Sequence, residues 1–306
     1  MNSWLLKGLD GGNPLAFLAA LGTLRTAALA RPDYRCHMTW REAEGGWRPE
    51  LSVETEEKLD LVADLTATLA CMRNHKAFMF ADDLSITFDQ FATVAKEACD
   101  NATTAERKFV DFLAAFGSDV PGKDDKMSST AFKLLGGGQT SFLGSIRTFV
   151  RDTEAEHLSK ALLEPWRYDD PMSKGHTMFW DFRDDVRRAL RWNEPSGDPA
   201  RDKQGSVWGA NRLAIEGLPL LPTGPVGSQL ETTGFTLRKG NGMFWTWPIW
   251  ETDASLDVVR SLLALSDLRR EQPDRRKLSA LGIREIYRCQ RIPRGNYKNF
   301  TPAQPV

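Results

Sequence analysis

The chain has 306 residues, of which 41% are hydrophobic and 26% are charged, and this balance excludes a disordered or fibrous protein. Lysine and arginine total 40 against 41 aspartates and glutamates, so the net charge of −1 excludes a uniformly basic protein that coats DNA. The sequence contains no run of 18 apolar residues and no CxxC pair, and residues 1–14 lack the basic and apolar regions expected of a signal peptide. We therefore expect a cytoplasmic protein with reduced cysteines and no membrane partner.

Several segments carry apolar residues at helical spacing. Asn13 and Pro14 suit the N-cap and first position of a helix with an apolar stripe over the next ten residues. Thr103 and Glu106 predict a capping box before a helix that ends at Gly117. Further stripes at helical spacing run from Val62 to Met72, from Phe142 to Val150 and from Val259 to Leu263.

Strand signals predict two hairpins. Residues 34–41 and 47–53 flank a Gly-Gly pair, and residues 230–238 and 243–250 flank an Asn-Gly pair. The second hairpin places Met243, Trp245 and Trp247 on one face. Residues 283–292 form either a strand or a helix. These elements together predict an α+β fold, rich in helix, with two or more short antiparallel hairpins.

Composition also divides the chain along its length. Two polar segments with proline and glycine, residues 117–129 and 193–206, predict linkers. We expect an acidic N-terminal α+β region at residues 1–125. The C-terminal region, residues 126–306, holds a glycine-rich segment, the tryptophan-rich hairpin and a basic end. The two regions are either separate domains or one continuous domain.

The charge pattern is the strongest indication of function. Residues 42–125 carry 18 acidic and 8 basic side chains, whereas residues 264–300 carry 10 basic and 4 acidic ones. Arginine binds phosphate oxygens in pairs, and the aromatic residues of the basic segment could stack on unpaired bases. One interpretation is contact with nucleic acid; the other is pairing of these arginines with the protein's own carboxylates. The predicted contacts are Arg284, Arg288, Arg291, Arg294 and Lys298.

A run of glycines precedes the predicted helix at residues 142–150. Consecutive glycines let backbone N–H groups converge on an anion, so Gly137, Gly138 and Gln139 are a second predicted contact to phosphate. The run is not a Walker A loop, because no Lys-Ser/Thr pair follows it. The alternative is a tight turn in which Thr140 or Ser141 caps the helix.

Two acidic patterns raise the question of metal chemistry. Asp33, Glu56 and Lys58 match the order of residues in PD…ExK nucleases, where the acids hold Mg²⁺ and the lysine assists the attacking water. The segment from Glu56 to Lys58 is expected to open a helix, which argues against that site. Asp181, Asp184 and Asp185 lie near His176, but interleaved arginines favour ion pairs. No catalytic constellation emerges, and we expect no cofactor or metal.

Motifs spread along most of the chain carry a family resemblance. The N-terminal LKGLDGGNPLAFLAALGTLR (residues 6–25) resembles the start of CRISPR-associated proteins from type I-G (formerly I-U) loci. Similar segments follow in the same order: GGGQ at 136–139, WDFRDDVRRALR at 180–191, GANRLA at 209–214 and the closing Arg291-Ile292. Two groups from these loci resemble the chain, a large-subunit-like family and a shorter helicase–nuclease-extension family.

The resemblance implies a role in antiviral DNA interference. Large-subunit-like members sit in a guide-RNA complex and help to recognise target DNA without cleaving it. It implies a non-catalytic effector subunit that contacts target DNA or guide RNA, with other effector subunits or the helicase–nuclease as protein partners. The alternatives are a protein-interaction module that docks on one of those partners through its acidic face, and a metal-dependent nuclease.

Overall fold

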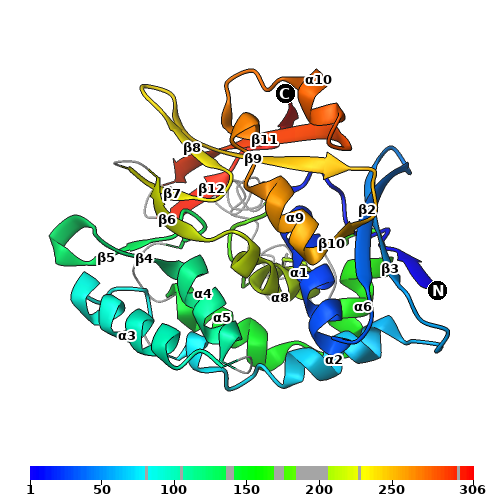
Figure 1. Ribbon diagram of the computed structural model, residues 1–306, viewed down its shortest axis with the longest axis horizontal. Coiled ribbons are helices and arrows are strands. Elements are labelled where there is room, and N and C mark those ends of the chain that lie inside the picture. The colour runs from blue at the N-terminus through cyan, green and yellow to red at the C-terminus, as the bar shows by residue number, and fades with distance from the viewer. Residues whose placement is uncertain are drawn as a thin grey trace, which may run out of the picture.

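The computed structural model describes residues 1–79, 82–103, 106–135, 141–168, 176–183, 206–226, 229–294 and 297–306. The α+β prediction is confirmed, because helices combine there with short antiparallel sheets. The helices are α1 (Pro14–Ala30), α2 (Leu61–Ala70), α3 (Phe88–Asp100), α4 (Arg107–Phe116), α5 (Phe142–Asp152), α6 (Ala155–Leu163), α8 (Trp208–Gly217), α9 (Leu256–Leu263) and α10 (Arg275–Ser279). Figure 1 shows α1 and α8 at the centre of the molecule, with α2 to α5 along its lower side. No helix of the described residues is long and apolar enough to cross a membrane.

The first sheet joins the N-terminal strands to a strand from much later in the chain. Its order is β1-β3-β2-β10, with every neighbouring pair antiparallel. The predicted hairpin is confirmed, and its turn holds Glu44 and Gly45 at positive φ angles of 52° and 74°. Because Ala254 pairs with Met38, both halves of the chain contribute to this sheet. The strands are β1 (Asn2–Leu5), β2 (Cys36–Ala43), β3 (Gly46–Val53) and β10 (Ala254–Ser255).

The second sheet consists of C-terminal strands in the order β12-β11-β9-β8, with β13 paired to β11. The strands are β8 (Phe235–Arg238), β9 (Gly242–Trp250), β11 (Ile283–Arg294), β12 (Tyr297–Phe300) and β13 (Gln304–Pro305). The Asn-Gly hairpin is confirmed for β8 and β9, and the ambiguous segment 283–292 is a strand. Trp245 and Trp247 share a face of β9 and are fully buried, with ring centroids 4.5 Å apart.

Two small hairpins complete the strands of the described residues. Strands β6 (Thr223–Val226) and β7 (Gln229–Thr232) pair with each other, so residues 229–232 do not extend the β8–β9 hairpin. Strands β4 (Gly117–Pro121) and β5 (Met127–Ser129) also pair, with the short helix η2 (Lys123–Asp125) between them. The prediction of a linker at residues 117–129 is therefore wrong. The second predicted linker falls almost entirely at residues 184–205, outside the described residues.

Helix boundaries follow the local signals in one case and depart from them in another. Asn13 caps α1 as predicted, because its side-chain oxygen accepts hydrogen bonds from the next two free backbone N–H groups. The predicted capping box at Thr103 is wrong: α4 starts at Arg107 with Glu106 as its N-cap. The side chain of Glu106 instead pairs with Lys76, 2.7 Å away. Helix α4 does end at Gly117, as predicted.

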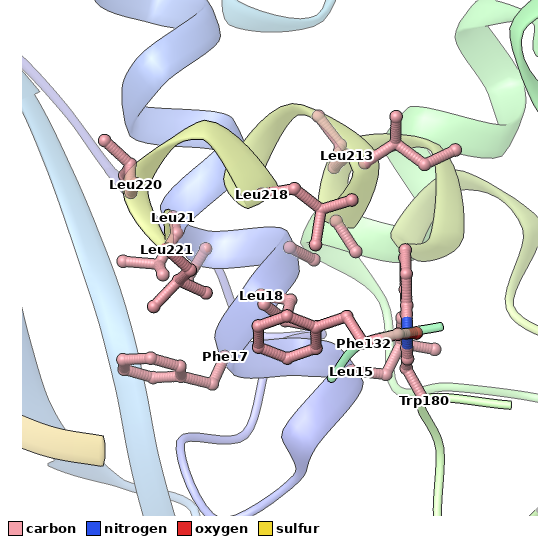
Figure 2. Close-up of a cluster of buried hydrophobic side chains, with 14 of the residues drawn as sticks. Leu15, Phe17, Leu18, Leu21, Phe132, Trp180, Leu213, Leu218, Leu220 and Leu221 are labelled. Atoms are coloured by element: carbon pink, nitrogen blue, oxygen red, sulfur yellow. The ribbon is translucent and has the colours of Figure 1, made fainter. Parts of the chain in front are cut away.

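Close contact between α1 and α8 forms the centre of one hydrophobic core that spans both halves of the chain. A Cβ atom built on Gly22 would lie 1.7 Å from the carbonyl oxygen of Leu213, so only glycine allows this approach. Figure 2 shows leucines of both helices packed with Phe132 and Trp180 from the middle of the chain. Residues on both sides of position 125 therefore share this core.

An ionic cluster lies within the same contact. Glu216 of α8 accepts hydrogen bonds from Arg25 of α1 at 2.7 Å and from Arg212 of α8 at 2.9 Å. All three side chains are at most 2% exposed. The guanidinium of Arg25 also lies over the Phe112 ring, 5.2 Å from its centroid. Burial alone would raise the pKa of Glu216, but the two arginines outweigh it and hold that pKa below its usual value.

Candidate nucleic-acid interface

A cleft of about 600 Å³ lies where β7, β8, β9, β11 and β12 meet the segment that leads into the glycine run. Three cations of the described residues line it, Lys133, Arg291 and Lys298, and we call it the cationic cleft. Glu231 also lines it, but this carboxylate is already paired with Arg269. The cleft therefore has an excess of positive charge that carboxylates of its own lining do not neutralise.

Arg291 projects from β11 into the cationic cleft and is held from two sides. Its Nη2 donates to the carbonyl oxygen of Lys133 at 3.0 Å, and its Nη1 lies 3.9 Å from the sulfur of Met243. Its Nε has no hydrogen-bond partner among the described residues. Burial lowers the pKa of Arg291 to about 10, because desolvation disfavours the charged form.

Lys298 and Lys133 complete the positive lining. The side chain of Lys298 is exposed, and desolvation together with the charges of Arg291 and Lys133 lowers its pKa. Lys133 is partly neutralised, since its Nζ lies 3.2 Å from a carboxylate oxygen of Asp83. The backbone of Lys298 is fixed by a hydrogen bond to the carbonyl of Leu134. An anion in the cationic cleft would relieve the repulsion among these cations.

Arg288, another predicted contact, is built into the fold. It is 7% exposed, and its guanidinium donates to Thr246 Oγ1 at 2.8 Å and to the backbone carbonyls of Leu268, Arg270 and Glu271. Burial lowers the pKa of Arg288 to about 10. These four acceptors hold the Arg288 guanidinium inside the fold, away from the cationic cleft.

The remaining predicted contacts are spread out. Arg284 is exposed at the start of β11, and its Nε lies 3.6 Å from Glu251. It does not line the cationic cleft. The side chain of Arg294 and the residues Gly137, Gly138 and Gln139 lie outside the described residues. In the sequence this glycine run directly follows Leu135, which lines the cleft.

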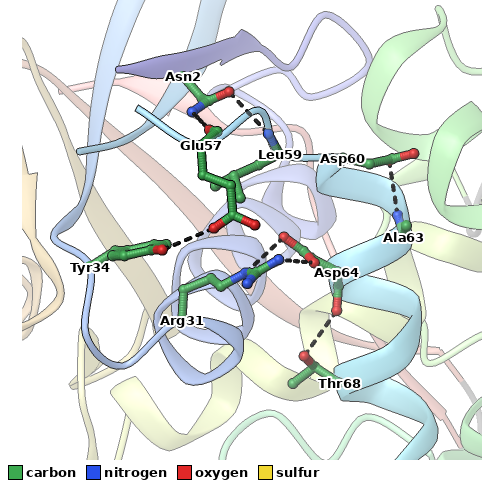
Figure 3. Close-up of polar contacts among 9 residues, drawn as sticks. All are labelled: Asn2, Arg31, Tyr34, Glu57, Leu59, Asp60, Ala63, Asp64 and Thr68. Atoms are coloured by element: carbon green, nitrogen blue, oxygen red, sulfur yellow. Dashed lines mark hydrogen bonds and ion pairs between the residues drawn. The ribbon is translucent and has the colours of Figure 1, made fainter. Parts of the chain in front are cut away.

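The nuclease pattern falls on the loop between β3 and α2. Glu56 and Lys58 are exposed in that loop, and the helix expected there begins only at Leu61, after its N-cap Asp60. Figure 3 shows what holds the loop: Asn2 bonds to its backbone, and Tyr34 donates to the Glu57 carboxylate at 2.9 Å. No group of three potential metal ligands occurs among the described residues.

In the described part of the acidic segment after Trp180, the carboxylate of Asp181 is bound by groups of the protein itself. Asp181 is 1% exposed and accepts hydrogen bonds from Tyr168 Oη, Asn13 Nδ2 and the backbone N–H of Arg183. Desolvation raises the pKa of Asp181. His176 lies instead against Phe149 and Trp208. Asp184 and Asp185 lie outside the described residues.

Lys133 is the cleft residue that sequence reasoning missed. It lies three positions before Gly136, so a cation adjacent to a glycine run was the available signal. Its carbonyl also binds Arg291, which comes from a strand 158 residues further along the chain. No local pattern predicts that pairing.

No family model matches the chain, and no curated protein or solved structure is significantly similar to it. The resemblance to proteins of type I-G CRISPR loci therefore stays a prediction from the sequence.

Proposed function

We propose that the protein is a non-catalytic, nucleic-acid-binding subunit of a type I-G CRISPR effector, and that the cationic cleft contacts the backbone of target DNA or guide RNA. The CRISPR context rests on the sequence motifs alone. The contact rests on one observation, the convergence of Lys133, Arg291 and Lys298 on a cleft in which Glu231, the one carboxylate among the described lining residues, is already paired.

The chemistry of the cationic cleft suits phosphate oxygens. The guanidinium of Arg291 lines the cleft, where its Nη1 has only the weak sulfur acceptor of Met243, and Lys298 offers an exposed ammonium group in the same lining. A phosphate accepts from both and lowers the repulsion between them. The accessible apolar part of the lining, such as the exposed Leu237 and the partly exposed Met243, would contact sugar or base surfaces.

The test is fluorescence anisotropy with labelled single-stranded RNA, single-stranded DNA and duplex DNA across a range of salt concentrations. We expect the double variant R291Q/K298Q to bind nucleic acid more weakly. On a single strand, the slope of the logarithm of the binding constant against the logarithm of the salt concentration should become shallower by about 1.4, since each phosphate contact contributes about 0.7. Arg284 and Arg288 are left unchanged in this variant.

The matched control is R276Q. Arg276 is an exposed cation of the same basic segment, on α10, and it does not line the cationic cleft. We expect R276Q to keep the wild-type slope. Equal slopes for R291Q/K298Q and the wild type, in variants with wild-type circular dichroism, would refute the proposed contact.

A second candidate is a protein-interaction module of the same system. The observation that favours it is that much of the basic segment is neutralised internally: Arg275 pairs with Glu285 at 2.6 Å and Lys277 with Asp267 at 2.6 Å. Arg269 and Arg270 also have carboxylate partners. Capture of the helicase–nuclease after nuclease treatment, with no anisotropy change on any nucleic acid, would favour this candidate over the first.

A further inference from the structure

A second cleft, of about 440 Å³, shares none of its described lining residues with the cationic cleft. Its walls include Trp166, Tyr168, Phe182 and Tyr287, and we call it the aromatic cleft. All four rings are partly exposed, whereas Trp245 and Trp247 are fully buried in the core. Partly exposed rings that line one cleft give a ligand aromatic surface to contact, and the volume is in the range of small-molecule sites.

Asp181 makes the wall of the aromatic cleft rigid. This buried carboxylate binds Tyr168 Oη at 2.6 Å, the Arg183 N–H at 3.0 Å and Asn13 Nδ2 at 3.2 Å. Tyr168, Arg183 and Asn13 all line the cleft, and Asn13 is 168 positions before Asp181 in the sequence. Burying a carboxylate is costly without such bonds, so this one fixes three lining residues in place.

Charged groups complete the aromatic cleft. The Arg183 guanidinium lies over the Tyr168 ring, 4.9 Å from its centroid, and Arg183 is exposed. Arg48 is 3.9 Å from Asp10, and its buried Nε has no hydrogen-bond partner among the described residues. Cations can bind a phosphate, while the Asp10 carboxylate can accept from an exocyclic amino group of a base.

We propose that the aromatic cleft binds a single nucleotide unit, with the base stacked on its aromatic side chains and the phosphate on Arg183 and Arg48. The shared chemistry is a nucleoside monophosphate, either free in solution or as one unstacked nucleotide of a strand. The inference goes beyond the proposed function and does not depend on the cationic cleft.

The experiment is isothermal titration of the full chain with AMP, adenosine and ribose 5-phosphate. In a second arm, a short adenine-containing oligonucleotide is compared with the same strand lacking one base, using R291Q/K298Q protein to remove the cationic cleft. Tight AMP binding, about tenfold stronger than that of ribose 5-phosphate, identifies a free nucleotide. Binding of the intact strand only, reduced by loss of the base, identifies an unstacked nucleotide. Binding in neither arm, or equal affinity for AMP and ribose 5-phosphate, overturns the proposal.

Two variants locate the ligand. F182L keeps apolar bulk but removes a stacking face, and we expect at least about fivefold weaker binding of whichever probe the wild type binds. R183Q removes an exposed cation, so it should weaken AMP or strand binding but leave adenosine affinity unchanged. R276Q is the control, and thermal melting confirms that each variant is folded. Wild-type affinity in both F182L and R183Q would place the ligand elsewhere and overturn the proposal, whatever the result for R291Q/K298Q.

Discussion

Replacing Glu216 with glutamine removes the carboxylate that two buried guanidinium groups share. Glutamine has nearly the same shape, so the change tests charge rather than volume. Arg25 and Arg212 would remain at most 2% exposed, with an uncharged amide in place of their common partner. Breaking a buried ion pair by removing one partner costs about 3–5 kcal/mol, and here one carboxylate serves two cations. We expect E216Q to lower the free energy of unfolding by at least about 3 kcal/mol.

Urea denaturation followed by circular dichroism measures this change. The control is E285Q, which breaks the 2.6 Å pair with the half-exposed Arg275 and should cost less than about 1 kcal/mol. The pKa of Glu216 is held below its usual value, so its contribution is present above the ordinary glutamate pKa and is lost as the pH falls through the folded value. The difference in the free energy of unfolding between the wild type and E216Q should therefore become smaller at acidic pH. A cost for E216Q no larger than that for E285Q would refute this reasoning.

Three further changes test other parts of the structure. G22A should cost at least about 2 kcal/mol by urea denaturation, because its Cβ would meet a carbonyl of α8, while G224A, with open space around it, should stay within about 0.5 kcal/mol. R288M leaves one hydroxyl and three backbone carbonyls without their hydrogen-bond donor and should lower the free energy of unfolding by about 2 kcal/mol. K298M should leave the urea midpoint unchanged. Desolvation lowers the pKa of His75 in the folded protein. As the pH falls, the imidazole therefore gains its proton in the unfolded chain first, and the free energy of unfolding decreases. The variant H75N should flatten part of this decline between about pH 7 and pH 5; an unchanged slope would contradict it.

Local signals predicted those elements whose stabilising contacts are themselves local. The Gly-Gly turn and the strands beside it predicted the β2–β3 hairpin, and Asn13 with Pro14 predicted the start of α1. The capping box at Thr103 failed because Glu106 pairs with Lys76, which is 30 residues away. The segment 117–129 looked like a linker because its composition is polar, yet it forms a hairpin.

The candidate sites depend on which side chains are buried, and charge counting cannot supply that. Arg288 and Ile286 are two positions apart on β11, and both are buried, so strand periodicity could have warned that this arginine faces inward. The cationic cleft and the aromatic cleft assemble residues from opposite halves of the chain. Arg291 with Lys133, and Asp181 with Asn13, are pairings that no spacing in the sequence reveals.

The contact between α1 and α8 also has a consequence for how the chain is made. Arg25 and Glu216 are 191 residues apart, so the first helix leaves the ribosome long before its partner is synthesised. At about 5–20 residues per second, that interval is roughly 10–40 s. During this time α1, whose residues from Pro14 to Ala27 are all buried in the finished protein, exposes its apolar side chains. The nascent protein should therefore be a substrate for chaperones that bind apolar helices until translation reaches α8.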